Sequence, residues 1–158
     1  MWYYCVDSMK KTIFSYSAKR LVWFVPIVVS ANALFTSSAR EAALFIIAAG
    51  TSTLLALLCT SVIKYLVRKP RSAERVFSSH DVYAFPSGHA TGLASISYST
   101  YLQGYPIFWA VILMSVIIVF ARVRLKVHDY KDIIAGIFVG VIVAHYMFRA
   151  IYIFLQGL

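Results

Sequence analysis

Five apolar segments, separated by short polar or basic stretches, dominate the hydropathy pattern of this chain. They run from about residue 21 to 37, 42 to 63, 86 to 100, 107 to 121 and 133 to 155. An α-helix needs about 20 apolar residues to cross roughly 30 Å of hydrocarbon, and these segments come close to that length. The pattern predicts an all-α fold, a polytopic membrane helix bundle of five to six spans.

Residues 2–17 show a different pattern, in which apolar side chains recur at helical spacing and charged side chains occupy the other faces. The apolar positions are Trp2, Val6, Met9, Ile13 and Tyr16. This pattern predicts an amphipathic helix on the membrane surface, and an ordinary helix packed against the bundle is the alternative. We therefore expect a single domain over residues 1–158, with the interfacial helix in residues 1–20 and the bundle in residues 21–158.

Composition agrees with a membrane location. Hydrophobic residues make up 61% of the chain and charged residues only 13%, which lies outside the range of soluble globular domains. The first residues lack the pattern of a cleavable signal peptide, so we expect the apolar segments to remain in the mature protein. Cys59 lies in an apolar run and Cys5 near the N-terminus, which argues against a disulfide framework and against a zinc site.

Positive charge gathers at one end of the predicted spans. Of the 15 Lys and Arg residues, Arg40 and Arg149 alone fall at the opposite end of a five-span chain. A cationic face of this size is typical of proteins that meet anionic headgroups, either as substrate or as the surrounding leaflet. The ordinary excess of positive charge in cytoplasmic loops is the alternative.

Three motifs fall at this same end of the spans. They are Lys64 to Arg71 after the second span, Pro86-Ser87-Gly88-His89 at the start of the third, and Arg122, His128 and Asp132 between the fourth and fifth. The count of spans rests on hydropathy and does not depend on the motifs, so their convergence is an independent indication of one common site.

His128 and Asp132 are four residues apart where a helix is expected to begin, so their side chains can lie on one face and meet. A carboxylate at one ring nitrogen fixes the tautomer and makes the other nitrogen a better nucleophile or base. A purely structural pair is the alternative. Arg122 lies six residues before His128, an interval that does not fit one helical face. We expect the chain to leave the helix there or to wrap around an anion.

The second motif is typical of a turn that opens a helix. Ser87 can cap the helix, and Gly88 lets an anion approach the backbone N–H groups at the helix start. His89 could protonate a departing alcohol as a general acid. Arg71 and Arg122 are candidates for bidentate contacts to phosphate oxygens. The alternatives are an ordinary N-cap and basic residues that reach the interface at the end of a span.

Together the motifs resemble the signature of the type-2 phosphatidic acid phosphatase superfamily, which is Lys-x6-Arg-Pro, Pro-Ser-Gly-His and Ser-Arg-x5-His-x3-Asp. The second motif matches in full, and the key residues of the other two occur at the same intervals. Two positions depart from the signature. Ser72 replaces the proline of the first motif and Ala121 replaces the leading serine of the third, which affects local loop shape and one hydrogen bond.

The resemblance implies a metal-independent lipid phosphatase that needs no cofactor. In that scheme His128 attacks phosphorus to form a phosphohistidine, Asp132 orients the ring, and His89 protonates the leaving oxygen. The residues that would hold the phosphoryl oxygens are Lys64, Arg71, Ser87, Gly88 and Arg122. The sequence also has no paired carboxylates of the kind that hold Mg²⁺ or Zn²⁺, so no metal site is expected.

Several lipids remain candidate substrates: lipid A 1-phosphate, phosphatidylglycerophosphate, undecaprenyl diphosphate and phosphatidate. A lipid-to-lipid phosphotransferase with the same histidine, and a non-catalytic bundle that binds anionic lipid, are the alternative functions. The expected partners are a phosphorylated lipid and the bilayer, and no nucleic acid. The sequence leaves the oligomeric state open.

The resemblance implies six spans in a bacterial inner membrane, with the site on the periplasmic or extracellular face. Five spans and the basic residues before the first span would instead place this face in the cytoplasm. We keep the periplasmic or extracellular expectation, because loops that bind phosphate are basic for reasons unrelated to membrane insertion.

Overall fold

The computed structural model describes residues 22–70, 83–124 and 128–157 of the chain. An α-helix occurs at each of the five predicted apolar segments. The helices are Val22–Thr36, α2 (Ala39–Val67), α3 (Gly88–Leu102), α4 (Phe108–Arg124) and α5 (Tyr130–Gln156). The all-α expectation is confirmed for this part of the chain, in which an isolated bridge between Pro70 and Tyr83 is the sole β-type pairing.

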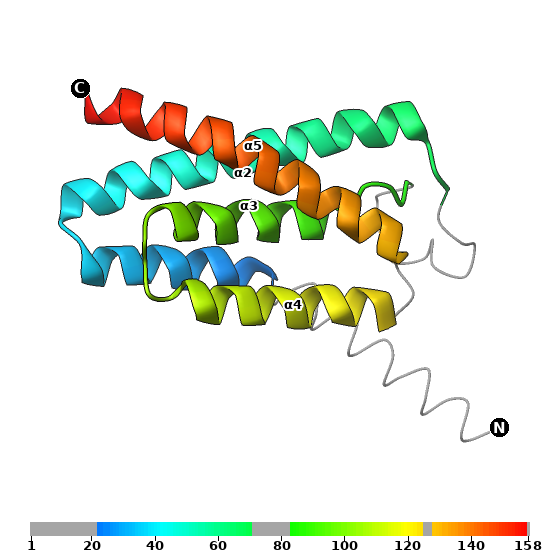
Figure 1. Ribbon diagram of the computed structural model, residues 1–158, viewed down its shortest axis with the longest axis horizontal. Coiled ribbons are helices and arrows are strands. Elements are labelled where there is room, and N and C mark those ends of the chain that lie inside the picture. Colours follow the sequence, from blue (N-terminus) through cyan, green and yellow to red (C-terminus); the bar gives the residue numbers. More distant parts are fainter. Residues whose placement is uncertain (1–21, 71–82, 125–127, 158) are drawn as a thin grey trace, which may run out of the picture.

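The helices lie side by side along the long axis of the molecule, and α3 is in contact with each of α2, α4 and α5. Consecutive helices run in opposite directions (Figure 1). The C-terminal ends of α2 and α4 therefore lie at the same end of the bundle as the N-terminal ends of α3 and α5. The motif residues of the described segments all occur at this end.

Small residues set the contact between α3 and α5. Gly136, Gly140 and Ala144 follow one another at intervals of four on the buried face of α5. A Cβ added at Gly136 would lie less than 3.0 Å from the backbone oxygen of Ser87, the N-cap of α3, and one at Gly140 would lie less than 3.0 Å from that of Thr91. Two helices approach this closely in a membrane when small residues line the interface. The close contact fixes the start of α3 against the first turns of α5.

The far end of the bundle is held by aromatic packing. Phe45 contacts the ring of Tyr105 edge to face at a centroid distance of 4.9 Å and that of Phe148 at 5.9 Å. This cluster also includes Val25 and Val29 of the first described helix, both buried. The buried apolar cluster therefore continues from these aromatic rings along the first described helix.

The outer faces of the long helices are apolar. Leu54 and Leu58 of α2 and Phe138 and Ile142 of α5 are all at least half exposed, as side chains that face lipid would be. Among the described residues α2 and α5 are long and apolar enough to cross a membrane, whereas the other helices are shorter. The count of five to six spans stays a prediction, and the surface helix predicted for residues 1–20 lies outside the described residues.

Candidate functional site

The end of α2 carries Lys64 toward the start of α3. Lys64 is buried in the last turn of α2, and its Nζ lies 4.0 Å from the position that a Cβ on Gly88 would occupy. The helix ends at Arg68, which adopts a left-handed conformation with φ 50°. The next residue, Lys69, accepts a 2.9 Å hydrogen bond from the N–H of Ala84. This turn brings the first motif beside the second.

Ser87 caps α3 and ties it to α5. Its Oγ accepts a 3.5 Å hydrogen bond from the N–H of Ala90, and its own N–H donates to the carbonyl oxygen of Asp132 at 2.9 Å. The carbonyl of Ser87 accepts from both the N–H and the Oγ1 of Thr91, at 3.0 and 3.1 Å. Ser87 therefore holds the second motif against the third, and Gly88 and His89 stand at the positive end of the α3 dipole.

Asp132 and His128 are buried at the start of α5, with 1% and 3% of their surface exposed. The His128 Nδ1 atom lies 3.8 Å from Asp132 Oδ2, which is ion-pair range but longer than a hydrogen bond. The same Oδ2 atom accepts a 3.1 Å hydrogen bond from the N–H of Asp129. The carboxylate thus faces the histidine ring while it caps the first turn of its own helix.

Lys69 holds the other oxygen of this carboxylate. Its Nζ donates to Asp132 Oδ1 at 2.6 Å and to Asp129 Oδ2 at 2.9 Å. Burial alone would lower the pKa of the Lys69 ammonium, but its hydrogen bonds with Asp132 and Asp129 outweigh burial and raise the pKa above its ordinary 10.5. Lys69 is therefore cationic at neutral pH, and the stability from these pairs is present below pH 10.5 and lost as pH rises through the raised pKa.

Arg122 lies in the last turn of α4 and is only 2% exposed. A buried guanidinium is costly unless anions or hydrogen-bond acceptors compensate it. The end of α4 lies at the same end of the bundle as the starts of α3 and α5 (Figure 1). Arg71, the remaining predicted contact to phosphate, lies outside the described residues.

A groove of about 630 Å³ runs from this site along the bundle between Val22–Thr36, α2 and α3. Its polar end is formed by Lys64, Gly88 and His89. Leu54 and Leu57 line the groove further along α2, and Leu54 lies about 15 Å from Lys64 at the rise of an α-helix. The groove therefore joins cationic and histidine side chains to an apolar channel.

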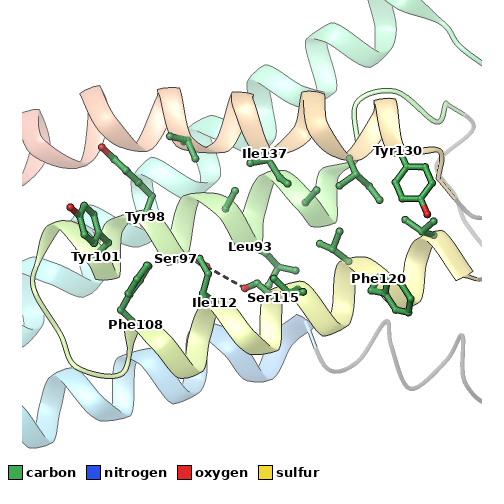
Figure 2. Close-up of a pocket in the computed structure, with 17 residues that line it drawn as sticks. Leu93, Ser97, Tyr98, Tyr101, Phe108, Ile112, Ser115, Phe120, Tyr130 and Ile137 are labelled. Atoms are coloured by element: carbon green, nitrogen blue, oxygen red, sulfur yellow. Dashed lines mark hydrogen bonds between the residues drawn. The ribbon is translucent and has the colours of Figure 1, made fainter.

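A second groove, of about 530 Å³, lies between α3, α4 and α5 and is almost entirely apolar (Figure 2). Its polar side chains include Ser97 and Ser115, whose hydroxyl oxygens are 3.2 Å apart. Tyr101 and Phe108 lie at one end and Phe120 and Tyr130 at the other. None of the motif residues lines this groove.

Comparison with known proteins identifies the family. The model of the PAP2 superfamily matches residues 45–155, which is more than half of the chain. The chain belongs to the PAP2 superfamily. The resemblance drawn from the three motifs is therefore confirmed, and the matched residues include every predicted site residue.

The fold is also similar to a solved PAP2 structure. That structure is the crystal structure of the first transmembrane PAP2 type phosphatidylglycerolphosphate phosphatase from Bacillus subtilis. The match has a TM-score of 0.60 at 17% sequence identity, and it covers 98% of this chain and 88% of the other. The PAP2 family and the shared fold support a membrane protein and a membrane phosphatase.

The sequence did not identify Lys69 as a partner of Asp132 in this PAP2 site. The residue was visible only as one of several basic residues after the second apolar segment, and its partner Asp132 lies 63 positions further along the chain. Thr91 was missed as well, although its position one turn after Ser87 is a usable signal. Its Oγ1 accepts a 2.9 Å hydrogen bond from Thr60 of α2 and donates to the carbonyl oxygen of Ser87, so one hydroxyl connects α2 to the start of α3.

Proposed function

We propose that this PAP2 protein is a metal-independent lipid phosphatase that works through a phosphohistidine on His128. The observation that carries the proposal is the buried pair of His128 and Asp132 at the end of the bundle where Lys64 meets the start of α3. A histidine ring beside a carboxylate, with cations and a helix N-terminus close by, has the components for attack on a phosphate group.

The reaction has two steps in this proposal. His128 Nε2 attacks phosphorus while the bond from phosphorus to the lipid oxygen breaks, and protonated His89 gives its proton to the leaving oxygen. Water then attacks the phosphohistidine, the P–N bond breaks, and His89 takes a proton from that water. Asp132 stabilises the positive charge that develops on the His128 ring. Inorganic phosphate and the dephosphorylated lipid are the products.

Charge on the phosphoryl oxygens would be stabilised from several directions. Lys64 and the first N–H groups of α3 flank the position where the groove meets the site. Arg122 contributes a guanidinium at the end of α4, and Arg71 is proposed as a further contact. Fixed cations and aligned N–H groups in a buried site stabilise a transition state more than they stabilise a solvated substrate.

The groove between Val22–Thr36, α2 and α3 supports a lipid rather than a water-soluble ester as substrate. An acyl or prenyl chain in this groove would place its phosphate beside Lys64 and His89. We propose a lipid phosphomonoester or diphosphate, with the four lipids named from the sequence as candidates. The proposed location is a bacterial inner membrane with the site on the periplasmic or extracellular face.

Phosphate release by the purified protein in detergent tests this function. The assay compares lipid A 1-phosphate, phosphatidylglycerophosphate, undecaprenyl diphosphate and phosphatidate, each with and without EDTA. We expect release from at least one lipid, unchanged by EDTA, because the cationic groups of the site stand where a metal would otherwise be needed. Activity that disappears in EDTA would contradict the scheme. Transfer of labelled phosphate to a second lipid would instead establish the phosphotransferase.

Replacement of Gly92 by leucine is expected to block the groove. Gly92 lines it, and a Cβ there would meet Leu57 at 3.8 Å, so a larger side chain extends into the channel. We expect kcat/KM to fall about tenfold or more for a long-chain lipid phosphate, equal to about 1.4 kcal/mol. A short-chain, water-soluble phosphate ester should be hydrolysed at the unchanged rate.

Ala110→Leu is the matched control for this change. Ala110 is exposed on α4 and lines neither groove. A leucine at Ala110 enlarges a side chain outside the grooves and should leave the hydrolysis of both substrates unaffected. Equal losses on both substrates in the Gly92 variant would show that the groove does not hold the lipid chain.

A further inference from the structure

The carboxylate of Asp132 is held at both oxygens by groups other than His128. Lys69 Nζ donates to Oδ1 at 2.6 Å, and the N–H of Asp129 donates to Oδ2 at 3.1 Å. Two fixed donors on opposite oxygens leave the carboxylate little freedom to rotate about its last bond. Oδ2 is also the atom that lies 3.8 Å from His128 Nδ1. Lys69 and the N–H of Asp129 therefore fix the orientation of the Asp132 carboxylate relative to the His128 ring.

We infer that Lys69 is a positioning residue of the phosphoryl-transfer reaction, which acts by holding Asp132 toward His128. The inference rests on the proposed function of His128. In this role Lys69 touches neither the phosphate nor the leaving group. Its effect passes through the carboxylate, which must be in place before the ring attacks.

Charge balance supports the same role. Asp132 is 1% exposed, and a buried carboxylate requires a compensating cation. The His128 ring must be neutral at the nitrogen that attacks phosphorus, so it cannot supply that charge before the reaction begins. Lys69 supplies it at that stage, and the ring gains positive charge only as the P–N bond forms. The carboxylate thus has a cationic partner throughout the cycle.

The backbone around Lys69 is placed for this task. The Lys69 carbonyl accepts a 2.9 Å hydrogen bond from Ala84, and Pro70 pairs with Tyr83. These contacts anchor Lys69 beside Ala84, which lies three residues before the Ser87 cap. A second ion pair, to Asp129 at 2.9 Å, holds the ammonium from its exposed side. Lys69 consequently connects the first motif to the third, as Ser87 connects the second to the third.

A direct contact between Lys69 and the phosphate is the competing role, because an ammonium has a third N–H donor. The two roles predict different kinetics. Loss of a phosphate contact raises KM or lowers kcat regardless of Asp132. Loss of a positioning contact lowers kcat through Asp132 alone. The test therefore needs both kinetic constants and a second substitution at Asp132.

The experiment measures kcat and KM for Lys69→Met, which keeps the stem of the side chain and removes its charge. The substrate is the lipid that the wild type hydrolyses in the assay above. We expect kcat to fall about 10- to 100-fold, as for a misplaced catalytic group, with KM within twofold. Lys69→Arg should restore at least half of kcat, because a guanidinium can reach both carboxylates. Lys131→Met is the matched control, at an exposed lysine between the same two aspartates, and should match the wild type.

A double-mutant cycle with Asp132→Asn gives the second readout. If Lys69 acts through Asp132, then Lys69→Met should lower kcat less than twofold in the Asp132→Asn background. The inference would be overturned if the losses in kcat from the two substitutions multiply in the double variant. A rise in KM, or wild-type kinetics, in Lys69→Met would overturn it as well. If Asp132→Asn is too slow to measure, the split between kcat and KM together with the rescue by arginine decides the question. Activity retained by His128→Ala would instead contradict the proposed function. Failure of the Lys69 inference and failure of the proposed function are therefore distinguishable.

Discussion

Replacement of His128 by alanine is expected to abolish phosphate release. The variant has no nitrogen to attack phosphorus, so water would have to displace the lipid oxygen directly. Loss of a nucleophile that acts with a partner group costs on the order of 10⁴-fold or more in kcat. The ring is buried at the start of α5 and faces Asp132. The measurement is phosphate release under single-turnover conditions, together with acid-labile labelling of the protein by a ³²P-labelled lipid phosphate.

His145→Ala is the matched control for this loss. His145 lies on the same helix, and its Nδ1 is 2.9 Å from the hydroxyl of Tyr98. Its removal should lower the thermal stability in detergent, because it leaves the Tyr98 hydroxyl without this contact, but the folded fraction should keep its activity and its labelling. Labelling that persists in His128→Ala would show that another residue carries the phosphoryl group.

The positions of the helices could be predicted from the sequence because each apolar run has to satisfy its backbone hydrogen bonds within a membrane. The ends of the helices could not be predicted so well. The second apolar run was expected to end at residue 63, whereas α2 continues to Val67. A hydropathy pattern stops at the first lysine, but Lys64 is buried within the helix and turned toward Gly88. The helix therefore continues one turn beyond its predicted end, with the buried Lys64 in that last turn.

The gathering of the motifs could also be predicted, since consecutive spans alternate in direction. The contacts within the site could not. A spacing of four residues indicates that His128 and Asp132 share a helical face. It predicts neither their 3.8 Å separation nor the ion pair between Asp132 and Lys69. The ion pair depends on how the end of α2 is placed relative to the start of α5. The sequence between the two residues contains no local pattern that specifies it.

The close contact between α3 and α5 leads to the second large expected effect. A Cβ added at Gly140 would lie less than 3.0 Å from the backbone oxygen of Thr91 and 3.0 Å from the Cβ of Ala94. Neither atom belongs to the end of a flexible side chain, so Gly140→Ala can be accommodated only if the two helices move apart. Overpacking of this kind costs about 1–3 kcal/mol of stability. The separation would also strain the hydrogen bond from Ser87 to Asp132, two turns away.

We therefore expect Gly140→Ala to melt at a lower temperature in detergent and to lose up to about 100-fold in kcat, as when a catalytic group is misplaced by about 1 Å. Gly50→Ala is the control for stability, since a Cβ at Gly50 meets nothing within 4 Å and alanine favours a helix by about 1 kcal/mol over glycine. It should melt at or above the wild-type temperature. A Gly140 variant as stable and as active as the wild type would show that α3 and α5 can separate without disturbing the site. In that case the placement of Ser87 beside Asp132 would not depend on the close packing of the two helices.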